Sequence, residues 1–74
     1  MKNDYNFNLH LCRVYVQRFK HGHMCIDELV LSLCNCLRST EKVYRYILRS
    51  SRFDIRMKIR LLSVLNTILE YAEK

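Results

Sequence analysis

Apolar residues recur at every third or fourth position along most of the chain, which is the spacing of one face of an α-helix. In the first segment, from residue 4 to about residue 21, these positions are Tyr5, Leu9, Cys12, Val16 and Phe19. Over residues 6–11, polar and apolar residues also alternate as in a β-strand, but the alternation changes parity at Cys12. We therefore predict a helix for this segment, with a strand as the alternative.

Short polar segments predict the ends of the first two helices. Asn3 or Asp4 is suited to cap the first helix, because its side-chain oxygen accepts hydrogen bonds from free backbone amides. Gly22, the only glycine, stands where a left-handed residue would end that helix. A second helix is predicted from about residue 24 to residue 37, with apolar positions at Ile26, Leu29, Leu33 and Cys36.

The region around Ser39 allows two interpretations. The apolar spacing continues through it, so residues 24–50 fit one long helix. Alternatively, Thr40 caps a separate helix, since a capping box that starts at Ser39 would need a glutamate or glutamine where Lys42 stands. We favour a break or a kink near Ser39.

The last predicted helix, from about residue 54 to residue 72, has a wide apolar face. Ser51 or Asp54 would cap it. Two adjacent apolar stripes run along it, one formed by Met57, Leu61, Val64, Ile68 and Tyr71 and the other by Leu62, Leu65, Leu69 and Ala72. A surface helix needs a narrower apolar face than this. Either the face packs inside a bundle, or it contacts a partner through Leu61, Val64, Leu65, Ile68 and Tyr71.

The composition supports the helical interpretation. The 74 residues include one glycine and no proline, whereas a strand-rich fold needs frequent turn residues. Half of the residues are apolar, which is too many for a disordered chain. We predict an all-α fold, a small three- to four-helix bundle that forms a single domain over residues 1–74.

The apolar segments are too short to cross a membrane. The longest uncharged ones, residues 29–37 and 61–69, have nine residues each, whereas a membrane-spanning helix needs about 20. The first residues, MKNDYNFN, are polar and lack the apolar core of a secretory signal. We therefore expect no membrane span and a cytoplasmic location, inside a host cell if the protein is viral.

Positive charge is concentrated in the middle third of the chain. Between residues 38 and 60, eight basic and two acidic residues give a local charge of +6, equal to the net charge of the whole chain. The basic residues of this row that we expect to bind an anionic partner are Arg38, Lys42, Arg45, Arg49, Arg52, Arg56 and Arg60. The first six have the spacing of a helix face, which would focus a positive field on one side.

This basic row has three interpretations. It is a solvated helix face, a surface for an acidic protein, or a surface for nucleic acid, whose phosphates bind lysine and arginine. Tyr44, Tyr46 and Phe53 are interleaved with the basic residues, and aromatic rings stack on unpaired bases.

The cysteines and histidines indicate a metal site only weakly. His21, His23 and Cys25 flank Gly22, but Cys34 and Cys36 would point their thiols about 200° apart on a helix. We predict no metal, no cofactor, and reduced cysteines buried in the apolar stripes. Without an acid placed to orient His23 and Cys25, or a glycine-rich phosphate loop, we also expect no enzyme activity and no catalytic residue.

Two functional hypotheses follow from these patterns. The first is a non-enzymatic interaction module, an adaptor, co-chaperone or regulator, that buries an apolar helix face against a protein partner or a second copy and presents a basic face to an anionic partner. The alternative is a basic helical regulator of transcription or of RNA that binds nucleic acid.

Overall fold

Four α-helices make up the protein in the computed structural model, which describes the backbone of residues 2–73 and the side chains of residues 8–72. They are α1 (Lys2–Lys20), α2 (Ile26–Leu37), α3 (Thr40–Arg49) and α4 (Ile55–Glu73), and the described backbone contains no strand. The predicted all-α bundle is confirmed, with four helices. The strand alternative for the first segment is wrong, because α1 is helical throughout.

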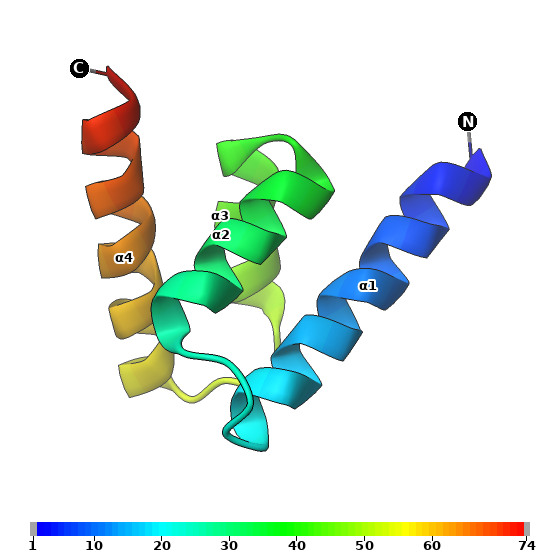
Figure 1. Ribbon diagram of the computed structural model, residues 1–74, viewed down its shortest axis with the longest axis horizontal. Coiled ribbons are helices and arrows are strands. Elements are labelled where there is room, and N and C mark those ends of the chain that lie inside the picture. Colours follow the sequence, from blue (N-terminus) through cyan, green and yellow to red (C-terminus); the bar gives the residue numbers. More distant parts are fainter. Residues whose placement is uncertain (1, 74) are drawn as a thin grey trace.

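The second helix lies at the centre of the fold. α2 packs against each of the other three helices, and α3 also packs against α4. In Figure 1, α1 and α4 lie on opposite sides, with α2 and α3 between them. Within the described part of the chain, α1 and α3 do not pack directly on each other, and this leaves room for a cleft between them.

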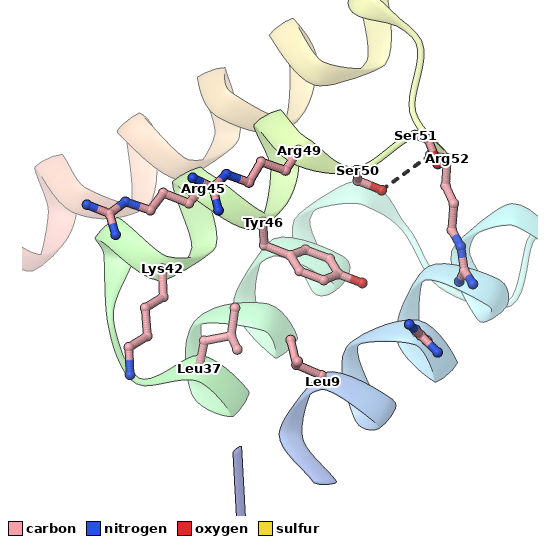
Figure 2. A pocket seen from close by; sticks show the side chains of 10 residues that line it. Leu9, Leu37, Lys42, Arg45, Tyr46, Arg49, Ser50, Ser51 and Arg52 are labelled. Carbon is pink, nitrogen blue, oxygen red and sulfur yellow. Dashed lines mark hydrogen bonds between the residues drawn. The ribbon is translucent and has the colours of Figure 1, made fainter. Parts of the chain in front are cut away.

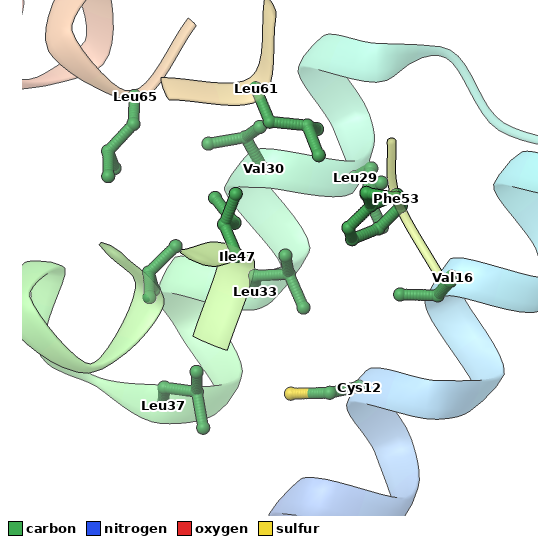
Figure 3. Close-up of a cluster of buried hydrophobic side chains, with 11 residues drawn as sticks. Cys12, Val16, Leu29, Val30, Leu33, Leu37, Ile47, Phe53, Leu61 and Leu65 are labelled. Carbon is green, nitrogen blue, oxygen red and sulfur yellow. The ribbon is translucent and has the colours of Figure 1, made fainter. Parts of the chain in front are cut away.

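The buried side chains form one core around α2. Figure 3 shows them converging on α2 from α1 on one side and from α4 on the other. The core residues are Cys12, Val16, Leu29, Val30, Leu33, Leu37, Val43, Ile47, Phe53, Leu61 and Leu65. α2 contributes four of them, and its sequence is apolar around much of its circumference, as expected of a helix packed on several sides.

The end of α1 matches its prediction, and its beginning does not. Gly22 has a φ of +80°, and the amide of His23 donates to the carbonyl of Arg18 at 2.9 Å, the pattern of a left-handed helix end. The helix begins at Lys2, so Asn3 and Asp4 lie within its first turn instead of preceding it. Their side chains, and that of Tyr5, lie outside the described residues.

The predicted break near Ser39 is confirmed, with a different cap. Arg38 adopts the left-handed conformation, at φ 56°, and its amide donates to the carbonyl of Cys34 at 2.9 Å. The chain then restarts as α3, where Ser39 is extended and its Oγ accepts from the amide of Lys42 at 3.4 Å. Thr40 is already helical, so Ser39 and not Thr40 is the cap, since a cap precedes the first helical residue.

Of the two predicted caps of α4, Ser51 and Asp54, the structure shows Asp54 in this role. Its Oδ1 accepts from the amide of Met57 at 2.8 Å, which satisfies one of the free amides at the helix start. The adjacent Phe53 is buried in the core, so the turn between α3 and α4 is anchored by a side chain.

No helix among the described residues combines the length and the apolar character that crossing a membrane requires.

Candidate anion-binding cleft

A cleft of about 560 Å³ lies between α1 and α3, above the C-terminal end of α2. Ten of the residues whose side chains are described line it, and none of these ten is acidic: Leu9, Arg13, Leu37, Lys42, Arg45, Tyr46, Arg49, Ser50, Ser51 and Arg52. Half of these are lysine or arginine. Because low-dielectric walls concentrate the field of such charges, the cleft attracts anions more strongly than the same residues on a flat surface.

Three of the cations come from one face of α3. Lys42, Arg45 and Arg49 are three and four positions apart and line the cleft together, as helix periodicity requires. Val43 and Ile47 occupy the opposite side of the helix and are buried. Burial of these two residues fixes the rotation of α3, so the core itself directs the basic face toward the cleft (Figure 2).

Two further cations reach the cleft from other parts of the chain. Arg13 lies on α1, next to Cys12, which is fully buried. Arg52 follows α3 in the turn, where its amide donates to the Oγ of Ser50 at 3.3 Å (Figure 2). The buried Phe53 holds the other side of Arg52, so the turn keeps this cation at the edge of the cleft.

Tyr46 is the aromatic residue among the described side chains of the cleft. It is half-buried, and Figure 2 shows its ring between Leu37, Leu9 and Arg52, with the hydroxyl on the side of Arg52. Burial, and next the nearby thiol of Cys12, raise its pKa above the usual 10.0, while Arg52 and Arg13 lower it. The side chain is therefore a neutral phenol at physiological pH, and Arg52 and Arg13 are the cations that act on it.

Among the described side chains, one carboxylate forms an ion pair with the basic face of α3. Glu41 accepts from Nη2 of Arg45 at 2.7 Å, one helical turn away. Both side chains are well exposed, so this pair contributes little to stability and competes weakly with an incoming anion.

The predicted basic row does not form one continuous helix face. The chain turns at Arg38 and again after Arg49, so the row is divided among α3, the following turn and α4. Lys42, Arg45, Arg49 and Arg52 come together in the cleft, whereas Arg38, Arg56 and Arg60 are exposed outside it. Helical spacing across a sequence does not establish a common face when a break resets the register.

Several other residues between positions 38 and 60 do not line the cleft. Lys58 donates from Nζ to the carbonyl of Leu48 at 2.8 Å, which joins α4 to the carbonyl end of α3, where a positive charge is favourable. Phe53 lies in the core, and Tyr44 is exposed outside the cleft. Of the three interleaved aromatic residues, only Tyr46 lines the cleft.

Sequence reasoning missed Arg13, Leu9 and Leu37 as parts of the same site. They lie on α1 and α2, far from α3 in the sequence. No local spacing signals that they meet the basic face, because their position depends on how α1 packs on α2.

The predicted apolar interface of α4 is largely used by the core. Leu61 and Leu65 are buried within the chain itself, and Val64 and Ile68 are half-buried against the core. Tyr71 is 73% exposed. Leu61 and Leu65 are thus internal contacts of the bundle, which corrects their assignment to a surface. The sequence pattern missed Ile55 and Ile59, which are 71% and 61% exposed.

The four cysteines are free thiols in different surroundings. Cys12 is buried, and burial followed by the neighbouring Cys36 raises its pKa to about 12. The thiol of Cys36 donates to the carbonyl of Asn8 at 3.2 Å, and burial raises the pKa of Cys34. Cys25 is exposed and donates to Glu28 at 3.3 Å, so the expectation that every thiol is buried is wrong for it. It precedes α2 and is not part of an apolar stripe.

Within the described part of the chain, no three histidine, cysteine or acidic side chains are grouped closely enough to hold a metal ion. His21 and His23 are exposed at the turn after α1.

Comparison of the chain with protein-family models, with curated proteins and with solved structures gave no match.

Proposed function

We propose that the protein is a small non-enzymatic binding module that holds an anionic segment of a partner macromolecule in the cleft between α1 and α3. One observation carries this proposal. No acidic side chain among residues 8–72 lines this single cleft, whereas five cations from α1, α3 and the turn after α3 do: Arg13, Lys42, Arg45, Arg49 and Arg52.

Burial favours the cleft over the wide apolar face of α4 as the main binding site. Leu61 and Leu65 pack inside the chain, so they are not free to contact a partner. In contrast, Lys42, Arg45, Arg49 and Arg52 are all exposed. Because exposed charges contribute little to the stability of the fold, these side chains can bind a ligand without destabilising the protein.

The test compares two double variants with the same change in charge. Arg45→Glu with Arg49→Glu alters the cleft, and Arg56→Glu with Arg60→Glu alters α4 outside it. Retention on heparin, used as a general polyanion, should fall sharply for the cleft variant and only modestly for the α4 variant. Circular dichroism checks that both variants keep their helical content.

Equal losses for the two variants would mean that binding follows net charge and not the cleft, and this result would contradict the proposal. Unchanged retention of the cleft variant would contradict it as well.

A protein contact on α4 is a second candidate, and it is favoured by the exposure of Ile55 and Ile59, one turn apart on the same helix. Arg56 and Arg60 follow them directly in the sequence. A second copy would bring like charges together, so we propose a partner whose apolar helix face is flanked by acidic residues.

This second candidate predicts a monomer in light scattering at 0.1 M salt, and a bound protein that is lost when Ile55→Ser is combined with Ile59→Ser. The matched control is Leu31→Ser, because Leu31 is also exposed but lies on α2. If the wild type instead forms a stable dimer, and Ile55→Ser with Ile59→Ser dissociates it, the partner on α4 is a second copy of the chain and not an acidic protein.

A further inference from the structure

We propose that the anionic segment held in the cleft is a single-stranded nucleic acid, RNA or DNA, an inference that rests on the proposed function above. The cleft combines two features, a row of guanidinium groups and an apolar, aromatic floor beneath them. Each nucleotide of a strand has a phosphate that pairs with guanidinium groups and a planar base that stacks on an aromatic ring.

The cations suit phosphate groups. Four of the five are arginines, whose planar guanidinium donates two parallel hydrogen bonds to a phosphate. Lys42 and Arg49 are seven residues apart on α3, a distance of about 10 Å along a helix, and Arg52 continues the row beyond the helix end. A strand with one phosphate per nucleotide therefore meets positive charge over the whole length of α3.

The floor suits bases. Leu9, Leu37 and Tyr46 form the apolar part of the lining, and the half-buried ring of Tyr46 lies among the cations (Figure 2). A base that enters the cleft can stack on this ring while its phosphate stays with the arginines, an arrangement typical of proteins that bind single strands.

The same features argue against the other polyanions. In a duplex the bases stack on each other, so their faces do not reach a recessed ring such as that of Tyr46. The carboxylates of an acidic peptide pair with arginines as phosphates do, so the charges alone do not separate the two ligands. The floor does, because an acidic peptide leaves the aromatic ring without a matching planar group.

The experiment measures fluorescence anisotropy with four labelled probes on the full chain. The probes are a 12-nucleotide oligouridine RNA, the corresponding oligothymidine DNA, a 12-base-pair duplex and a 12-residue polyglutamate. We expect both single strands to bind at least tenfold more tightly than the duplex or the polyglutamate. If three to five phosphates are neutralised, the logarithm of the association constant should fall against the logarithm of the salt concentration with a slope of roughly −2 to −3.5.

Variants of Tyr46 separate stacking from charge. Tyr46→Leu keeps an apolar side chain but removes the aromatic face, and we expect it to weaken single-strand binding about five- to twentyfold. Tyr46→Phe keeps the ring and should stay within about twofold of the wild type, because the hydroxyl is not required for stacking. If Tyr46→Leu loses helical content, two measurements still test the inference. They are the affinity of Tyr46→Phe relative to the wild type and the order of the four affinities of the wild type.

The failures of the two proposals are distinguishable. Polyglutamate or duplex binding as tight as single-strand binding, or full affinity in a folded Tyr46→Leu variant, would overturn the nucleic-acid inference. The proposed function would survive that result as long as Arg45→Glu with Arg49→Glu abolished binding and Arg56→Glu with Arg60→Glu did not. Equal losses in these two double variants would overturn both.

Discussion

At the scale of single residues, position in the fold separates side chains that are identical in the sequence. Cys12 is fully buried between α1 and α2, whereas Cys25 is exposed before α2 begins. Side chains of the same charge also differ in position, since Lys58 bonds to the carbonyl of Leu48, while Arg56 is exposed nearby. Burial changes the chemistry of a group as much as its type does, because it penalises the charged form.

The thiol of Cys12 makes stability depend on pH in the alkaline range. Burial raises its pKa from 9.0 to about 12, so the folded state keeps the proton that the unfolded chain loses first. The stabilising contribution is fully present below pH 9 and is lost as the pH rises toward 12. We expect the free energy of unfolding in urea to fall more steeply between pH 8 and pH 10.5 in the wild type than in Cys12→Ala.

The variant keeps Cys34 and Tyr46, whose pKa values are also raised, so the difference in slope reports the proton on Cys12 together with its smaller effect on the pKa of Tyr46. Identical pH dependence in the two proteins would show that the proton on Cys12 is not linked to folding.

At the scale of helices, turns and caps decide which side chains meet. The periodic apolar residues predicted where each helix lies, because burial requires one apolar face. They could not place the basic row, since the left-handed Arg38 and the cap at Ser39 reset the register between α2 and α3. Ser39 and Thr40 are both good cap residues, so the sequence alone did not distinguish them.

The cap of α4 carries a prediction at this scale. Asp54 accepts from the amide of Met57 at 2.8 Å, and its carboxylate also lies at the positive end of the helix. Asp54→Ala should lower the free energy of unfolding by about 1 kcal/mol. Ser51→Ala, at the other residue that the sequence suggested as a cap, should change it by less than about 0.5 kcal/mol. Chemical denaturation of both variants compares them, and an equal effect would contradict the assignment of Asp54 as the cap.

At the scale of the whole molecule, α2 determines both the core and the site. It packs on the other three helices, and its last residue, Leu37, belongs to the core and to the lining of the cleft. Arg13 and Arg49 face the same cleft although α1 and α3 do not pack together. The sequence predicted the bundle, but the cleft depends on helix packing across the chain, which no local pattern encodes.

A chain of 74 residues has a small core and a total stability of roughly 4–11 kcal/mol. Leu33 is fully buried at the centre of α2, so Leu33→Ala removes contacts to a core shared by all four helices. This variant should lose about 2–5 kcal/mol, a large part of the total, and its thermal unfolding should begin at markedly lower temperature. Leu31→Ala makes the same change on the same helix, where the side chain is 47% exposed, and should cost less than about 1 kcal/mol. If the two variants melted together, α2 would not be the helix on which the rest of the fold depends, and the position of the cleft above its end would need another explanation.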